Sequence, residues 1–274
     1  MLLLVQLSKK WVSMINDSIY RQRITKEQAG RIITGLQLFG DHQITRVDIT
    51  ASTNNDLKAD WSLAEIPQRI LIADRQTAGR GQHGRVWQSW PGQALLFSFT
   101  LKETGRTFPM SLLTGLAVHN ALQKLSSGRG LWLKWPNDVW LGQGKIAGVL
   151  CEGRFMAGIQ HWVIGVGINL KPPQDCSIAA ASFSEISQNL DAESILCEFF
   201  STFASFCAEE ESTLVEVWTK SAATFWQTRF LFSIDGQPGF IGLPLNIAVD
   251  GSLEVISEQQ KSRRLLSATL KPLF

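Results

Sequence analysis

The chain has 274 residues, of which 45% are hydrophobic and 18% are charged, and this composition excludes disordered, fibrous and low-complexity classes. Its 26 basic and 24 acidic residues give a net charge of +2, which is too small to indicate a nucleic-acid or membrane-surface partner on charge alone. The length suits one large domain with a small second one, or two ordinary domains.

The beginning of the chain carries no targeting signal that we can identify. The apolar run near residues 2–7 has no basic residue before it and ends at two lysines, which argues against a signal peptide. No apolar stretch approaches the roughly 20 residues of a membrane span. The four cysteines lack CxxC spacing and the four histidines lack an HxxxH pair, so no metal-site pattern is present. We expect buried, reduced thiols and a cytoplasmic protein.

Residues 1–24 predict an N-terminal extension, and the main domain is expected to begin near residue 25. Thr25 and Gln28 form a capping-box pattern for a helix that ends at Gly40. Val47 and Ile49 alternate with polar residues as in a strand. The run Ser52, Thr53 and Asn54 then offers N-cap candidates for a short helix.

The middle of the chain predicts strands around a long loop and a helix. Strands are expected at residues 69–74 (RILIAD) and 94–101 (ALLFSFTL), the second with its alternate apolar residues on one face. The glycine-punctuated loop of nearly twenty residues between them is long for a compact domain, which indicates a functional or mobile segment. Residues 109–126 predict an amphipathic helix. Strand segments follow at 131–135, 138–141, 145–152 and 162–168.

The last third of the chain predicts two helical stretches between residues 191 and 227 and then short strands. Asp235-Gly236 and Asp250-Gly251 are good hairpin signals. This pattern predicts a small β-barrel of about 45 residues at the C-terminal end.

The loop QTAGRGQHGR at residues 76–85 places three glycines and two arginines within seven residues. Glycine lets backbone N–H groups approach a ligand, and guanidinium groups bind carboxylate or phosphate by paired hydrogen bonds. The pattern lacks the Gly-Lys-Ser/Thr ending of a Walker loop, and its GxGxxG lies too far before the next strand for a dinucleotide fingerprint. An anion site and a solvated surface loop are about equally compatible with this segment alone.

Lys134, Asn137 and Asp138 lie around Pro136, and a turn at residues 142–144 can return Lys145 beside them. Two cations and a carboxylate would then converge. For this cluster taken alone, a strand edge whose lysines and Asp138 are solvated or paired is the more common explanation. The strand end GVGIN at residues 165–169 offers glycines for close approach and Asn169 as a donor and acceptor.

Four motifs in this order, ASTN, QTAGRGQHGRVW, KWPNDVWLGQGKIAGVL and VIGVGIN, make the chain similar to bacterial biotin-protein ligases from about residue 25 to its end. The sister family of lipoate ligases shares the superfamily, but KWPND together with the GRG loop resembles the biotin branch. The resemblance implies an α+β fold with a mixed-sheet catalytic domain, like that of class II aminoacyl-tRNA synthetases, at residues 25–227. It also implies an SH3-like β-barrel at residues 228–274.

In this family, biotin is joined to the α-phosphate of ATP as biotinyl-5′-AMP and is then passed to one lysine of a biotin carboxyl carrier protein such as that of acetyl-CoA carboxylase. Mg²⁺ is expected on the polyphosphate. The resemblance implies catalytic roles for Lys145 and Arg80. Asp138 would position the incoming lysine amine or take its proton. The expected binding residues for biotin and ATP are Ser52, Thr53, Asn54, Gln76, Arg80, Gly81, Gln82, Arg85, Trp87, Lys134, Asn137, Lys145, Gly148 and Asn169.

The chain departs from the family loop at Gln82, where Arg is common after the second glycine. Gln82 lacks the charge that would help to hold an adenylate. We therefore expect faster loss of the adenylate. The segment 171–182, rich in Pro, Ala and Ser, is expected to cover the site when ATP binds.

Some family members add an N-terminal DNA-binding domain, for which residues 1–24 are too short, so we expect no operator binding and no nucleic-acid partner. Because no apolar stretch is long enough to span a membrane, we also expect no membrane partner. A homodimer is left open. Two rival functions remain open as well. One is lipoate or octanoate transfer on the same fold, and the other is a regulatory protein that binds biotin or its adenylate without transferring it.

Overall fold

The computed structural model describes residues 43–62, 65–103, 105–127, 130–171, 179–188 and 191–274. The expected N-terminal extension and the helix expected after Thr25 lie outside the described residues, as does most of the expected cover segment 171–182.

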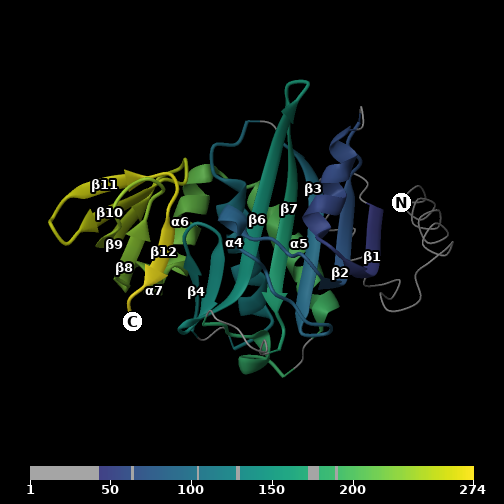
Figure 1. Ribbon diagram of the computed structural model, residues 1–274, viewed down its shortest axis with the longest axis horizontal. Coiled ribbons are helices and arrows are strands. Elements are labelled where there is room, and N and C mark those ends of the chain that lie inside the picture. The colour runs from purple at the N-terminus through teal and green to yellow at the C-terminus, as the bar shows by residue number, and fades with distance from the viewer. Residues whose placement is uncertain (1–42, 63–64, 104, 128–129, 172–178, 189–190) are drawn as a thin grey trace.

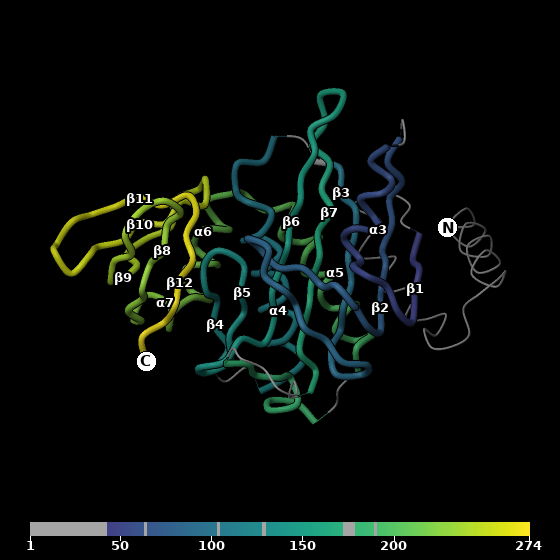
Figure 2. The backbone as a smooth tube through the Cα atoms, viewed as in Figure 1, coloured from purple at the N-terminus to yellow at the C-terminus, as the bar shows by residue number. Residues whose placement is uncertain are grey.

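The larger of two sheets has seven strands in the order β1-β2-β3-β7-β6-β5-β4. β1 pairs with β2 in parallel, and all other neighbours pair antiparallel. All strands expected in this part of the chain are confirmed. β6 and β7 are longer than expected because a hairpin turn at Ala157 and Gly158 carries them beyond their neighbours (Figure 2). The strands are β1 (Gln43–Thr50), β2 (Arg69–Gln76), β3 (Ala94–Glu103), β4 (Leu131–Lys134), β5 (Asp138–Leu141), β6 (Gly144–Met156) and β7 (Ile159–Asn169).

The two faces of this sheet are covered differently. Helices α4 (Met110–Lys124) and α5 (Ala192–Cys207) lie on one face (Figure 1). The Phe97 and Phe99 rings of β3 pack against α5, with Phe97 5.1 Å from the Phe199 ring and Phe99 5.2 Å from the Phe203 ring. Because side chains alternate along a strand, polar positions of β3 and glycines of β7 face the opposite side.

The short helix α3 (Thr53–Lys58) packs on that opposite side. Its Leu57 is fully buried against Leu71 of β2 and Val163 of β7. This one hydrophobic anchor holds the N-terminal turn of α3, with the Ser52–Asn54 run, over the centre of the sheet.

The second sheet is antiparallel, in the order β11-β10-β9-β8-β12, and confirms the expected separate β structure at the C-terminal end. Its strands are β8 (Phe230–Ser233), β9 (Phe240–Ile247), β10 (Leu253–Ser257), β11 (Ser262–Leu265) and β12 (Thr269–Pro272). It follows helices α6 (Glu211–Ser221) and α7 (Ala223–Gln227), so the region expected to hold two helices contains three.

The two sheets share one hydrophobic core, in which Phe230 and Phe232 of β8 belong to the same buried cluster as Leu116 of α4. The buried Trp135 indole N–H donates to the Gly251 carbonyl at 2.8 Å. A domain boundary at residue 227 stays a prediction, because the core continues across it.

The sequence also led to expectations about membrane spans and about the burial of cysteine thiols. Within the described ranges, no helix has the length and apolar character of a membrane span. Cys151, Cys197 and Cys207 are partly buried and pack against the hydrophobic core. Burial raises the pKa of the Cys151 thiol to about 12, which agrees with the expected buried thiol at this position.

Candidate active site

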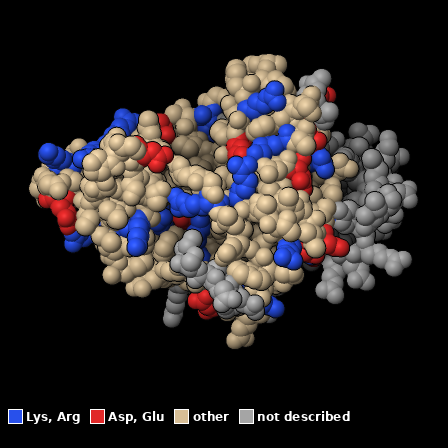
Figure 3. All heavy atoms as spheres, in the orientation of Figure 1, with Lys and Arg blue, Asp and Glu red and all other residues tan. Residues whose placement is uncertain are grey.

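A cleft of about 800 Å³ lies over the face of the large sheet that α3 covers in part. Its walls come from α3, the loop after β2, the turn between β4 and β5, strands β6 and β7, and the C-terminal strand β12. A band of lysine and arginine side chains crosses the middle of the face shown in Figure 3. The structure brings every predicted site residue to this cleft, namely Ser52, Thr53, Asn54, Gln76, Arg80, Gly81, Gln82, Arg85, Trp87, Lys134, Asn137, Asp138, Lys145, Gly148 and Asn169.

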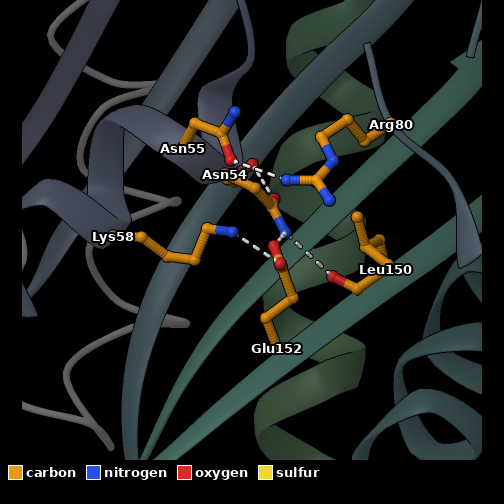
Figure 4. A network of polar contacts seen from close by, with 7 residues as sticks. Asn54, Asn55, Lys58, Arg80, Leu150 and Glu152 are labelled. Atoms are coloured by element: carbon orange, nitrogen blue, oxygen red, sulfur yellow. Dashed lines mark hydrogen bonds and ion pairs between the residues drawn. The ribbon is translucent and has the colours of Figure 1, made fainter. Parts of the chain in front are cut away.

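One end of the cleft is neutral and polar. The backbone N–H of Thr53 and its hydroxyl both approach Gln76 Oε1, at 2.8 and 3.0 Å. The side-chain carbonyl of Gln76 therefore accepts hydrogen bonds from within the protein, and the side-chain NH₂ group of Gln76 is left as a donor for the cleft. Asn54 donates to Glu152 at 2.9 Å and to the Leu150 carbonyl at 3.2 Å (Figure 4).

Glycines form the floor of the cleft. Gly148 and Gly167 are paired across β6 and β7, and the Trp87 indole lies on both. A Cβ at Gly167 would lie 2.6 Å from Trp87 Cε2, and one at Gly165 would lie 2.1 Å from Asn54 Oδ1. The glycines of the VIGVGIN motif thus leave room for two protein side chains that line the site.

The loop after β2 crosses in front of β6 and β7 (Figure 2) and folds back on itself. The Trp87 N–H donates to the Gly79 carbonyl at 2.9 Å, and the Gly81 N–H donates to the Arg85 carbonyl at 2.7 Å. The Gly81 N–H is therefore used inside the loop and does not point at a ligand. The Arg85 guanidinium donates to Thr269 Oγ1 of β12 at 2.8 Å and ties the loop to the second sheet.

The other end of the cleft is cationic. Asp138 lies between two lysines, with Oδ1 2.5 Å from Lys145 Nζ and Oδ2 3.3 Å from Lys134 Nζ. Burial by itself would raise the pKa of Asp138, but the two ammonium groups outweigh it and lower the pKa to about 2. Burial lowers the pKa of Lys134 from its ordinary value. Lys145 also lies over the Trp87 ring, 5.4 Å from its centroid.

The side-chain amides of Asn137 and Asn169 donate hydrogen bonds to backbone carbonyls. Asn137 Nδ2 donates to the Val149 carbonyl at 2.6 Å. Asn169 Nδ2 donates to the carbonyls of Lys145 and Ala181 at 3.2 and 3.1 Å. Asn169 therefore joins the first residues of β6 to the end of the segment expected to cover the site.

The described lining offers little to a metal ion. Asp138 has the single side-chain carboxylate among the described residues that line the cleft, and both of its oxygens face lysines. No group of three His, Cys, Asp or Glu side chains gathers anywhere in the described ranges. Because Mg²⁺ prefers carboxylate and phosphate oxygens, these residues do not fit a protein-held magnesium ion.

Sequence reasoning missed two parts of the site. Ser98 and Glu152 lie behind the Ser52–Asn54 run and contact it. Ser98 stood out as a polar residue in an apolar strand, which was a usable signal. The C-terminal residues that line the cleft were missed because no motif marks them, and they are Ala268, Thr269, Leu270, Lys271, Pro272 and Phe274.

Comparison with known proteins gives consistent similarities. The model of the Biotin/lipoate A/B protein ligase family matches residues 47–169. "Biotin--protein ligase 2" of Arabidopsis thaliana is 34% identical over 206 residues, which cover 71% of this chain and 58% of that protein. "Biotin--[acetyl-CoA-carboxylase] ligase" of Mycobacterium tuberculosis is 36% identical over 155 residues, covering 54% of this chain and 57% of that protein. The chain thus spans about half the length of the curated relatives it matches.

A solved structure extends the similarity to nearly the whole described fold. It is the biotin protein ligase from Aquifex aeolicus in complex with biotin and ATP, with a TM-score of 0.69 and 26% identity. The match covers 84% of this chain and 99% of that chain.

Proposed function

We propose that the protein is an ATP-dependent biotin-protein ligase, because the Biotin/lipoate A/B protein ligase family model matches residues 47–169 and the similar proteins include biotin-protein ligases. One observation carries the proposal. A single cleft joins a neutral pocket at Thr53 and Gln76 to a cationic centre at Lys145. Biotin has a charge distribution that complements the cleft, with a neutral cyclic urea at one end and a carboxylate at the other.

In the first step, a carboxylate oxygen of biotin attacks the α-phosphorus of ATP. The bond to the β-phosphate breaks, and biotinyl-5′-AMP and pyrophosphate result. Two anions must approach each other, so fixed positive charge at the reacting centre is the main requirement. Lys145 and Arg80 line the cleft and supply this charge in the proposal, with Arg85 and Lys134 adding to it. Mg²⁺ is expected to arrive with the phosphates of ATP.

In the second step, the neutral amine of a carrier lysine attacks the acyl carbon, and AMP leaves. A carboxylate with a pKa of about 2 is a weak base near neutral pH, so the pKa of Asp138 favours the positioning alternative over proton abstraction. Its contacts with Lys134 and Lys145 support the same role, since they fix both ammonium groups at the reacting centre.

Ser52, Thr53, Asn54 and Gln76 form the urea pocket in the proposal, and Trp87, Gly148 and Asn169 form the floor and far wall. A carrier domain of a biotin-dependent carboxylase such as acetyl-CoA carboxylase would be the acceptor, in the cytoplasm. The Mycobacterium tuberculosis relative, whose name specifies this acceptor, supports that choice.

Mass spectrometry of carrier domains tests the proposal. Apo-biotin carrier and apo-lipoyl carrier are each incubated with the protein, Mg-ATP and biotin, lipoate or octanoate. We expect one biotinyl group on one lysine of the biotin carrier only. Lipoyl or octanoyl transfer without biotinyl transfer would contradict the proposal and favour the first rival. Tight binding of biotin without labelling of any carrier would favour a regulatory binding protein.

A further inference from the structure

A chain of polar side chains runs from the cleft to an ion pair between Lys58, the last residue of α3, and Glu152 of β6. Thr53 Oγ1 lies 2.6 Å from Ser98 Oγ, and Ser98 Oγ lies 2.6 Å from Asn54 Oδ1. Asn54 Nδ2 donates to Glu152 Oε2 at 2.9 Å, and Lys58 Nζ lies 2.6 Å from Glu152 Oε1. Figure 4 shows Asn54, Glu152 and Lys58 in this order. Ser98 is fully buried, and Thr53 and Asn54 are 3% exposed.

The number of hydrogens that each polar group can donate determines which partner donates at each hydrogen bond of this chain. A carboxylate and a carbonyl only accept, so Glu152 and the Leu150 carbonyl both require the NH₂ group of Asn54 to face them. The carbonyl oxygen of Asn54 then faces Ser98, and the Ser98 hydroxyl must donate its one hydrogen there.

Thr53 is the next member of the chain. A contact of 2.6 Å between two hydroxyl oxygens needs a hydrogen between them, and Ser98 has none left. The Thr53 hydroxyl therefore donates to Ser98 rather than to Gln76, which lies farther away at 3.0 Å and already accepts from the Thr53 backbone N–H. Thr53 Oγ1 is left with lone pairs only, so it acts as an acceptor in the cleft.

We propose that Glu152, held by Lys58, is a positioning residue that, together with the Leu150 carbonyl, sets the direction of this hydrogen-bond chain and thereby selects a substrate head with an N–H group for Thr53. The proposal deepens the proposed function, on which it rests. Thr53 as an acceptor and the Gln76 NH₂ group as a donor together match a neutral head that carries an N–H beside a C=O, as a cyclic urea does. A ring that lacks N–H groups would leave the Thr53 acceptor unpaired in a buried site.

Two further observations support a fixed direction. A Cβ at position 165 would lie 2.1 Å from Asn54 Oδ1, so the amide of Asn54 fills the space that Gly165 leaves. The Lys58 and Glu152 side chains are only 19% and 24% exposed, and each neutralises the other's charge beside the buried chain.

The variant Glu152→Gln tests the direction without a change of size. Lys58 only donates, so the Gln carbonyl turns to Lys58 and its NH₂ group faces Asn54. Asn54 must then flip, which gives up its hydrogen bond to the Leu150 carbonyl, or lose its partner at position 152. A flip turns the Ser98 hydrogen to Thr53 and releases the Thr53 hydrogen, which turns to Gln76 Oε1 or into the cleft, so that Thr53 has one lone pair fewer for the substrate N–H. We expect the biotin Kd, measured by calorimetry, to rise roughly tenfold to a hundredfold. The KM for ATP is expected to stay at its wild-type value.

A second substitution should restore binding. In Glu152→Gln with Lys58→Met, no cation holds the Gln carbonyl, which can turn to Asn54 and restore the original direction. We expect the biotin Kd to return toward the wild-type value, which a merely structural role of Glu152 would not produce. The matched control is Glu198→Gln, because Glu198 also lies 2.6 Å from a lysine, Lys124, and accepts from a hydroxyl outside the cleft. It should leave the biotin Kd unchanged.

Wild-type affinity in Glu152→Gln would overturn the proposal, as would a double variant that melts like the wild type but binds as weakly as the single one. If Glu152→Gln does not fold, Ser98→Ala carries the test. It removes the acceptor of the Thr53 hydrogen, and unchanged biotin affinity would overturn the proposal. A wild-type protein that binds no biotin would contradict the proposed function and this proposal with it, whereas the outcomes above concern this proposal alone.

Discussion

At the scale of single residues, the cleft concentrates charges that need one another. Asp138 is 8% exposed and lies between two ammonium groups, one of them on the equally buried Lys134. Three charges in a buried site are stable only while all are present, because removal of one leaves a charge without a partner. Asp138 therefore contributes both to the fold and to the placement of Lys145.

Replacement of Asp138 by Asn should lower the free energy of unfolding at pH 7 by about 2 to 4 kcal/mol, because two lysines lose their common partner. The pKa of this carboxyl falls from 3.8 to about 2 on folding. Its contribution is therefore fully present above the unfolded value and is lost as the pH falls through the folded value. Urea denaturation at pH 7 and at steps between pH 4 and 2 measures both effects.

The control for this prediction is Glu65→Gln, since Glu65 is 89% exposed and lies 3.7 Å from Lys102. Its effect should stay below about 0.5 kcal/mol. An Asp138→Asn protein with wild-type stability, or with a deficit that persists unchanged at pH 2, would contradict the account.

Gln82 is the residue at which the loop departs from the loop of the biotin-protein ligases that the chain resembles, and it lines the cleft. Gln82→Arg should slow the release of biotinyl-5′-AMP roughly tenfold, because a charge-assisted hydrogen bond to the phosphate replaces a neutral one. Single-turnover trapping of released adenylate measures the rate. His83→Arg is the control, since it adds the same charge one residue away, where the side chain is exposed. Equal release from wild type and Gln82→Arg would refute the idea.

At the scale of elements, Gly148 of β6 and Gly167 of β7 leave room for the Trp87 ring, and Lys145 Nζ lies 5.4 Å from the centroid of that ring. The VIGVGIN pattern predicted close approach by a ligand. In the structure, the space above Gly165 and Gly167 is filled first by Asn54 and Trp87, which then line the cleft.

Gly167→Ala should displace Trp87, because the new methyl group would lie 2.6 Å from its ring. We expect the affinity for biotin and for its adenylate to fall by at least roughly tenfold, since an added buried methylene commonly destabilises its site by 1–3 kcal/mol. Gly115→Ala in α4 is the matched control, because the added methyl group would meet only Leu133 at 3.9 Å. That variant should gain about 0.5–1 kcal/mol of stability without loss of binding. Calorimetric titration and thermal melting distinguish the two, and equal binding by both variants would disprove the floor.

At the scale of the whole molecule, the cleft is completed by the last strand of the chain. β12 lines it, Arg85 of the loop after β2 donates to Thr269, and the Phe274 ring lies 6.2 Å from that of Trp140. The shared core and the Trp135–Gly251 hydrogen bond hold the second sheet against the first. The C-terminal sheet is thus part of the site as well as of the fold.

Thr269→Val removes the partner of Arg85 with little change of shape. We expect the KM for ATP to rise roughly two- to tenfold, because the loop loses one tie to the second sheet. The exposed Thr224→Val in α7, outside the cleft, should leave this constant unchanged. Initial rates of pyrophosphate formation give the comparison, and an unaltered KM in Thr269→Val would show that the tie has no role.

The order of motifs along the chain predicted which residues gather at the cleft, because ASTN, the GRG loop, KWPND and GVGIN each follow a local strand or turn signal. Glu152 and Ser98 could not be predicted in their positions. They meet Asn54 only through the register of β3, β7 and β6, which joins residues 44 and 98 positions apart. The position of Thr269 in the cleft could not be predicted for a similar reason, since it depends on how the two sheets pack.

The central claim is that this cleft activates biotin with ATP before any carrier is present, and isotope exchange between labelled pyrophosphate and ATP tests it most directly. The account predicts exchange that requires biotin, that needs no carrier protein and that falls at least about a hundredfold in Lys145→Met. Exchange that occurs with lipoate or octanoate but not with biotin, or that persists at the wild-type rate in Lys145→Met, would contradict it.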